Sequence, residues 1–188
     1  AMMAYGFRSR AHKFSLEEGE ISYLGDMEVP GKVLNQFSMD EHNTYFRIAT
    51  TIGDFGSNNV YIYDSELNQV GKLENLAKGE RIYSARFMGN KGYLVTFRRI
   101  DPLFVIDLSS PRFPKVLGEL KIPGYSDYLH PYDENHLIGI GKDTSENSFG
   151  GVSIRGVKLA LFDVSDVNSP KQLHQEIIGG RGTDSEVL

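Results

Sequence analysis

The chain has 188 residues, of which 40% are hydrophobic and 24% are charged, and its formal net charge is −5. This composition suits one globular domain or two small ones, and the acidic balance lacks the basic surface of a nucleic-acid-binding protein. No apolar run approaches the roughly 18 residues of a membrane-spanning helix, and the absence of Cys excludes disulfides, thiolate metal sites and cysteine nucleophiles.

Residues 1–13 are predicted as an N-terminal tail, and they contain no charged-then-apolar leader, so no signal peptide is visible. Residues 14–188 are predicted as one continuous β segment. Its first part, residues 14–28, is expected to hold the last two strands of a structural unit, at 14–16 and 21–27. The many aromatic residues, 10 Tyr and 11 Phe, and 20 Gly favour an all-β chain.

A repeat of about 45 residues follows along the chain. Asp64 ends the run Val-Tyr-Ile-Tyr-Asp, and Asp107 ends the similar run Phe-Val-Ile-Asp 43 residues later. A third run, Leu-Ala-Leu-Phe-Asp, ends at Asp163, 56 residues beyond Asp107. Gly71 and Gly118 follow the first two runs and are 47 residues apart.

Each repeat is predicted to contain four short strands, because short apolar and aromatic segments alternate with Gly, Asn, Asp and Pro. The expected repeats occupy residues 33–73, 82–122 and 125–178, and residues 183–188 are expected to begin another. The predicted strands are 34–39, 45–50, 60–63 and 69–73; then 82–88, 93–97, 103–108 and 116–122; then 125–130, 136–140, 158–162 and 172–178. In the middle repeat, Gly-Asn-Lys-Gly at 89–92 is a hairpin turn signal.

Four short strands per repeat predict a partial β-propeller, with about three full four-stranded blades and a partial blade at each end. A blade that is apolar on both faces is unstable alone, and radial stacking buries those faces. A β-sandwich also has short strands at regular spacing, but it does not explain the repeat. No segment has the sustained 3.6-residue period of a helical array.

Residues 102–118, which contain Leu-Phe-Val-Ile-Asp and a later Leu-Gly, resemble the LVIVD-type repeat of prokaryotic surface proteins, and residues 161–170 resemble a second copy. With residues 125–136 and 180–186, nearly the whole chain from about His12 is similar to the secreted bacterial and archaeal β-propeller proteins distantly related to WD-repeat proteins. This resemblance implies an extracytoplasmic or cell-surface location. It brings no established catalytic residues, so none is assigned.

Three full and two partial blades are fewer than most closed rings contain. An open arc leaves apolar blade faces exposed, and such patches drive association. We therefore expect the chain to be part of a larger propeller, or to pair with a second copy through its terminal blades. A protein or carbohydrate is the expected ligand, whereas neither a nucleic-acid partner nor a membrane span in this chain is expected.

Ligands of propellers usually lie at the rim formed by the links between blades and the loops between second and third strands, which is an analogy at the level of the fold. Arg98, Arg99 and Arg181 lie in such segments and offer planar guanidinium groups to a carboxylate or phosphate. Asp127 and Asp184 are predicted to point from the innermost strands toward the channel and to accept hydrogen bonds. These five residues form the candidate ligand site.

Gln36 and Ser84 recur at the same place in the repeat as the channel aspartates, so they are also expected to face the channel. The alternative interpretation is that charges at the rim are solvated and that polar groups of the inner strands hold water or bond the backbone.

No metal or other cofactor is predicted, although three sets of residues offer oxygen or nitrogen ligands. Asp143 and Glu146, in the polar stretch 142–151, are candidate Ca²⁺ ligands, but their spacing does not match an EF-hand loop, so a mobile loop is expected. His130 and His136 could approach one another on neighbouring strands as zinc ligands, with a core or turn role as the alternative. Asp163 offers a hard oxygen, but its context favours turn chemistry.

Three functions follow from these patterns. The first is a non-catalytic propeller segment that binds a ligand or protein. The second is a carbohydrate-active enzyme in which Asp127 and Asp184 act as a carboxylate pair, which requires them to lie about 5–9.5 Å apart across a pocket. The third is a fragment without independent activity.

Overall fold

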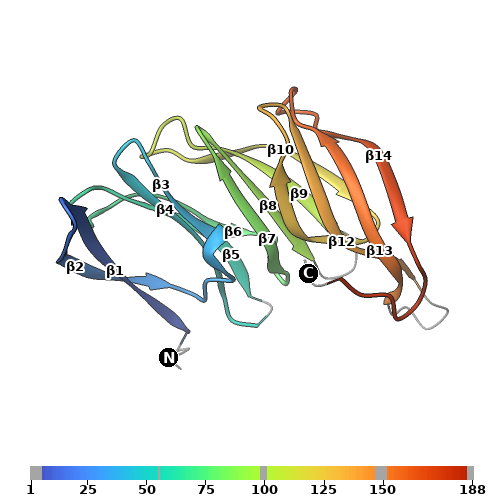
Figure 1. Cartoon of the computed structure of the whole chain (residues 1–188), viewed down its shortest axis with the longest axis horizontal. Helices are drawn as coiled ribbons and strands as arrows, with labels where there is room; N and C mark the ends of the chain where they lie inside the picture. The colour runs from blue at the N-terminus through green and yellow to red at the C-terminus, as the bar shows by residue number, and fades with distance from the viewer. Residues whose placement is uncertain (1–5, 55, 98–100, 147–151, 186–188) are drawn as a thin grey trace.

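The computed structural model describes residues 6–54, 56–97, 101–146 and 152–185, and nearly all of their regular structure is β-strand (Figure 1). Within these ranges, fourteen strands form three four-stranded sheets and one two-stranded sheet, all antiparallel. The prediction of an all-β chain organised as a partial propeller is confirmed.

The sheets follow one another along the chain, and in each blade the strands pair in chain order from one edge to the other. The N-terminal hairpin consists of β1 (Arg8–Glu17) and β2 (Glu20–Pro30). The first blade contains β3 (Met39–His42), β4 (Tyr45–Ile52), β5 (Ser57–Tyr63) and β6 (Gln69–Leu76). The second blade contains β7 (Arg81–Met88), β8 (Lys91–Phe97), β9 (Asp101–Asp107) and β10 (Lys115–Ile122). The third blade contains β11 (Tyr125–Pro131), β12 (His136–Glu146), β13 (Val152–Asp163) and β14 (Lys171–Ile178).

The first strands of the blades lie nearest one another. Strand β7 contacts β11, β3 and the short 3-10 helix η1 (Gln36–Ser38). Figure 1 shows the three blades side by side, with the N-terminal hairpin beyond the first blade. The propeller axis therefore lies on the side of β3, β7 and β11, and the fourth strands lie on the outside.

Apolar side chains fill the space between successive sheets. One cluster joins Val29 of the hairpin to the first blade, a second joins the first and second blades, and a third joins the second and third blades. Tyr63, Ile106 and Phe162 occupy equivalent places, since each is a buried residue of a third strand directly before an Asp. Neighbouring side chains of these strands point to opposite faces, so the first and second blades each contribute to two clusters, and the third blade contributes to one.

The repeated glycines allow each fourth strand to approach a turn of the next blade. A methyl group at Gly71 would lie 1.9 Å from the carbonyl oxygen of Pro111, and one at Gly118 would lie 2.5 Å from that of Val167. Both distances are shorter than atoms can approach, so these positions require glycine. The spacing of the glycines in the sequence thus reflects the packing of one blade on the next.

The aspartates that end the third strands organise the following turns. Asp107 accepts hydrogen bonds from the hydroxyl and backbone N–H of Ser109, at 2.6 and 2.9 Å, and Asp163 accepts the N–H of Ser165 at 2.9 Å. These hydrogen bonds lower the pKa of both carboxyl groups below the usual value. The predicted turn role of Asp163 is confirmed.

The structure differs from the predicted elements at both ends of the chain. Strand β1 begins at Arg8, inside the predicted tail 1–13, because its long pairing with β2 extends to Pro30. Thr183–Ser185 are not in a strand, and the rest of the strand predicted at 183–188 lies outside the described residues.

Two internal predictions were also wrong. Residues 36–38 form η1 rather than part of a strand, because the side chain of Asn35 accepts the N–H of Phe37 at 3.0 Å and starts a helical turn. The loop predicted from Lys142 is replaced by the extension of β12 and β13, whose ladder pairs Asp143 with Gly156 and continues to Glu146. Residues 147–151 lie outside the described residues.

Candidate functional site

A cavity of about 510 Å³ lies where β7 and β11 meet the start of the hairpin and the segment after β2. We call it the axial cavity. Its charged lining residues are Arg8, Lys32, Asp54, Arg81 and Asp127, and Phe7, Val33, Leu34 and Tyr83 add apolar surface. The cavity thus combines both signs of charge with aromatic and aliphatic surface, as ligand sites commonly do.

Two side chains of β7 fix β11 beside it and so position Asp127. The hydroxyl of Ser84 donates to the carbonyl oxygen of Ser126 at 2.7 Å, and Nε of Arg86 donates to that of Leu129 at 2.9 Å. Ser84 is buried in this contact and does not line the cavity. The alternative interpretation of Ser84, a polar group that bonds backbone, is therefore correct.

Asp127 is the predicted site residue that the structure places in the axial cavity. Its carboxyl group is half-buried, and no group in the described part of the chain donates a hydrogen bond to it. Burial raises the pKa of Asp127 to about 6, although the positive charges of Lys142 and Arg81 act in the opposite direction. A carboxyl group in this state can exchange a proton near neutral pH.

Three aromatic rings pack together beside Asp127. The ring centres of Tyr83 and Tyr125 are 4.8 Å apart, and those of Phe97 and Tyr125 are 4.7 Å apart. Arg81 stacks over Tyr83 at 4.8 Å and donates to its hydroxyl at 3.0 Å. Burial, which is the largest cause, and the negative charge of Asp127 raise the pKa of Tyr125 to about 12.

Asp184 approaches the same region through Lys142. The ammonium group of Lys142 lies 2.5 Å from Oδ1 of Asp184 and donates to the carbonyl oxygen of Thr183 at 3.2 Å. The hydrogen bond from Lys142 lowers the pKa of Asp184, whose side chain is 80% exposed. Asp127 and Asp184 are thus close enough to influence one another, and their environments move their pKa values in opposite directions.

Arg181 and Asp184 do not line the axial cavity, and Arg181 is exposed in the turn after β14. Arg98 and Arg99, the remaining predicted ligand residues, lie outside the described residues. Gln36 is exposed on η1. Arg81 and Lys142 were not among the predicted ligand residues, because only the fold shows that these cations approach Asp127.

The candidate metal ligands have other partners. Nε of Arg155 lies 2.7 Å from Oδ2 of Asp143, whose side chain is almost fully buried, so this carboxylate already has a counter-charge. The side chain of Glu146 lies outside the described residues. His136 contacts Asp133 at 2.9 Å and His130 contacts the hydroxyl of Tyr128 at 3.2 Å. In the described ranges, no group of three His, Asp or Glu side chains is arranged to hold a metal ion.

Comparison with known proteins identifies the family of this chain and two similar proteins. The family model described as a β-propeller domain matches residues 4–188. An uncharacterised protein of Methanocaldococcus jannaschii is 56% identical over 151 residues, which cover 78% of this chain and 23% of that protein. An uncharacterised protein of Archaeoglobus fulgidus is 48% identical over 166 residues, which cover 88% of this chain and 25% of that protein. The chain therefore spans about a quarter of the length of these relatives.

Across the described residues, no helix has the length and hydrophobicity needed to cross a membrane.

Proposed function

The chain belongs to the β-propeller domain family, and from this premise we propose that it is a non-catalytic binding segment of a larger propeller. The observation that carries the proposal is the axial cavity, where Asp127 has no hydrogen-bond donor in the described part of the chain and lies beside the aromatic rings of Tyr83 and Tyr125. A carboxylate beside aromatic surface offers hydrogen bonds and stacking to a hydroxyl-rich ligand such as an oligosaccharide, or to a polar loop of a protein.

We place this segment in a secreted or surface-associated prokaryotic protein. The proposal rests on the likeness of residues 102–118 and 161–170 to LVIVD-type repeats. Stacked blades suit a protein that binds ligands at the cell surface, because the sheets form a rigid scaffold while the loops at the rim can vary in sequence.

Isothermal titration calorimetry with a panel of neutral oligosaccharides tests the binding proposal. We expect saturable binding by at least one member of the panel and a loss of about tenfold in affinity for Asp127→Asn, which is what loss of a hydrogen bond to a charged group produces. Glu134→Gln, at an exposed hairpin turn of the third blade, is the matched control and should bind as wild type does. Equal affinities for wild type and Asp127→Asn would show that this carboxyl group does not contact the sugar.

A carbohydrate-active enzyme is the second candidate function. It is favoured by the opposite pKa shifts of Asp127 and Asp184, because a pair of carboxyl groups with separated pKa values can serve as acid and base. The engagement of Asp184 by Lys142 favours the binding role instead. Release of nitrophenol from aryl glycosides by wild type, and its loss in Asp127→Asn, would establish the enzyme.

A further inference from the structure

The first strands of the second and third blades contain a bulge at the same place. In β7 the pairing with β8 skips Tyr83, and in β11 the pairing with β12 skips Asp127. A bulge changes the direction of one side chain relative to its neighbours. Both bulge residues line the axial cavity, so the fold turns one aromatic and one carboxyl side chain into this space in the same way.

Burial is the largest influence on the pKa of Asp127, and charged groups from several elements act on it as well. Lys142 of β12 and Arg81 of β7 favour its ionised form, whereas Asp184, in the segment after β14, opposes it. Burial also raises the pKa of Tyr125, on the same strand as Asp127, to about 12, so this phenol is neutral at physiological pH. The charge of Asp127 therefore depends on how these neighbours are paired.

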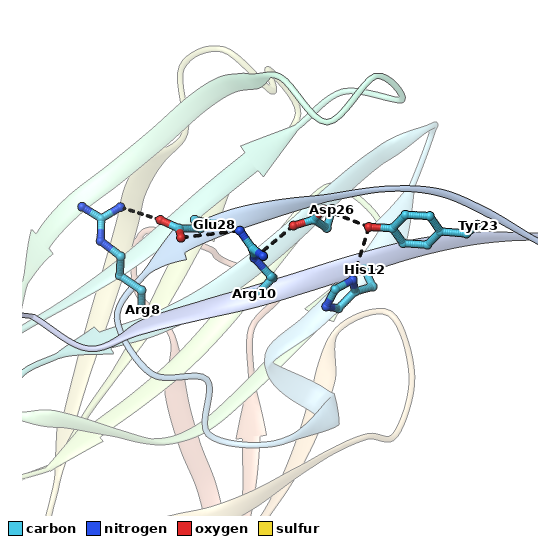
Figure 2. Close-up of polar contacts among 6 residues, drawn as sticks. All are labelled: Arg8, Arg10, His12, Tyr23, Asp26 and Glu28. Atoms are coloured by element: carbon cyan, nitrogen blue, oxygen red, sulfur yellow. Dashed lines mark hydrogen bonds and ion pairs between the residues drawn. The ribbon is translucent and has the colours of Figure 1, made fainter.

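Three further charged residues of the cavity wall are engaged elsewhere or exposed. Figure 2 shows Arg8 paired with Glu28 across the N-terminal hairpin, at 3.0 Å. Lys32 and Asp54 are exposed to solvent, where water and salt screen their charges. Charges at these three positions therefore act only weakly on Asp127.

Lys142 lies beside the strand that carries Asp127, but its ammonium group contacts Asp184. The register of β11 with β12 pairs Lys142 with Tyr125, two residues before Asp127. The side chain of Lys142 is 11% exposed, and its ammonium group lies 2.5 Å from Oδ1 of Asp184 and 3.2 Å from the carbonyl oxygen of Thr183. A buried ammonium group needs a counter-charge, and Asp184 supplies it.

Hydrogen bonds within the segment after β14 hold Asp184 in this position. The N–H of Thr183 donates to the carbonyl oxygen of Gly180 at 3.0 Å, and the N–H of Gly180 donates to the hydroxyl of Thr183 at 2.9 Å. The N–H of Ser185 donates to Oδ1 of Asp184 at 2.9 Å. The hydrogen bond from Lys142 and then that from Ser185 lower the pKa of Asp184 below its ordinary value, so this carboxylate stays ionised in mild acid.

We propose that Lys142 is a positioning residue of the axial cavity: because it pairs with Asp184, Asp127 can exchange its proton, and the cavity binds a neutral, hydroxyl-rich ligand at neutral pH and releases it in mild acid. An ionised carboxylate only accepts hydrogen bonds, and those it accepts are stronger than those of the neutral group. This inference rests on the function proposed for the axial cavity, and it adds control by pH and by the segment after β14.

Carbon-13 NMR of the side-chain carboxyl groups tests the charge control without a ligand. Asp184→Asn removes the counter-charge, so Lys142 acts more fully on Asp127, and the titration midpoint of Asp127 should move to lower pH. Lys142→Met removes the cation and should move the midpoint to higher pH, whereas Lys142→Arg keeps the charge and should leave it close to that of wild type. Lys121→Met, which breaks an exposed ion pair with Glu119, is the matched control and should not change the midpoint.

Isothermal titration calorimetry at pH 8, 6 and 5, with the neutral oligosaccharide that binds wild type most tightly, tests the control of binding. Wild-type affinity should fall about tenfold between pH 8 and pH 5, because a group whose pKa is about 6 is about nine-tenths protonated at pH 5. Asp127→Asn should bind with the same low affinity at each pH. At pH 6, where wild-type Asp127 is about half ionised, Asp184→Asn should bind up to about twofold more tightly than wild type and Lys142→Met more weakly.

Two results would overturn this inference alone. One is oligosaccharide binding by wild type that is equally tight at pH 8 and pH 5. The other is an Asp127 midpoint that does not move to lower pH in Asp184→Asn, a variant at a position whose side chain is 80% exposed, so this test holds even if Lys142→Met does not fold. No binding of any oligosaccharide at pH 8 would instead overturn the function proposed for the cavity, and the release in acid with it.

Discussion

Burial raises the pKa of Asp127 by more than the nearby cations lower it. Arg81 and Lys142 favour the ionised carboxylate, yet the pKa rises to about 6 because the half-buried group has lost part of its hydration. Asp184, held by Lys142 at an exposed position, has a lowered pKa. The pKa values of these two neighbouring aspartates therefore shift in opposite directions, because the fold buries one carboxyl group and pairs the other with a lysine.

This shift predicts how stability depends on pH. The folded pKa of Asp127, about 6, exceeds the ordinary value of 3.8 for an aspartate, so the folded state holds this proton more tightly than the unfolded state does. The contribution of the group is most favourable below about pH 4 and is lost as the pH rises through about 6. Asp127→Asn, which cannot ionise, should be more stable than wild type by about 1 kcal/mol at pH 7, a value reduced for partial solvent screening.

Urea unfolding at pH 4 and pH 7 measures this difference. The difference between Asp127→Asn and wild type should shrink toward pH 4, whereas exposed Glu134→Gln should match wild type at both values. A gain of the same size at both pH values would mean that ionisation of Asp127 is not its cause.

The repeated glycines give a second prediction for single residues. Gly71→Ala and Gly118→Ala should each destabilise the fold by about 2 kcal/mol, because the added methyl groups overlap backbone atoms of the next blade. Gly180→Ala is the control, since the nearest atom to its added methyl group is 4.0 Å away. Thermal unfolding that ranks Gly180→Ala with the other two would contradict this packing.

At the scale of elements, polar side chains connect each blade to the next. Arg47 of β4 is buried, forms an ion pair with Asp40 and donates to the carbonyl oxygen of Gly89 in the second blade. Its guanidinium group also lies 5.2 Å from the centre of the Phe87 ring. A single arginine thus forms an ion pair within its own blade and a hydrogen bond to the next blade.

Arg47→Ala should destabilise the fold by about 3 kcal/mol, because it leaves Asp40 and the Gly89 carbonyl oxygen without their donor. The double variant Arg47→Ala with Asp40→Ala should cost less than the sum of the single variants. Arg112→Ala, at an exposed turn, should change stability by less than about 0.5 kcal/mol. Additive free energies of unfolding would show that the two side chains do not act together.

On the scale of the whole molecule, one face of the third blade is not covered by another sheet in the described part of the chain. Leu159 is equivalent to Val60 and Leu103, since each lies four residues before the Asp that ends its third strand. Leu159 is 38% exposed, whereas Val60 is fully buried and Leu103 is 1% exposed. The neighbouring blade that buries the first two positions has no counterpart in the described residues beyond the third blade.

We predict that this face promotes self-association of the isolated chain. Leu159→Glu should shift sedimentation velocity profiles toward the monomer, because a charge on the open face opposes its burial. Phe113→Glu, at an exposed turn where the side chain is 76% accessible, should leave association unchanged. A wild-type monomer at all concentrations tested would contradict the prediction.

The sequence alone determined the architecture. The spacing of Asp64, Asp107 and Asp163, the repeated glycines and the alternation of apolar segments with turn residues are local signals, and they predicted four-stranded blades correctly. Two element boundaries were predicted wrongly, because Asn35 starts a helical turn and Asp143, paired with Arg155, continues a strand.

Only the tertiary structure decided which side chains lie together at the axial cavity. Asp127 was predicted from its place in the repeat, but its meeting with Arg81 and Lys142 depends on how the inner strands pack. In the described part of the chain, the free edge of β1 likewise follows from the pairing of β1 with β2 alone. Turn chemistry and periodicity act over a few residues, whereas desolvation, charge pairing and free strand edges arise between segments that meet only in the folded chain.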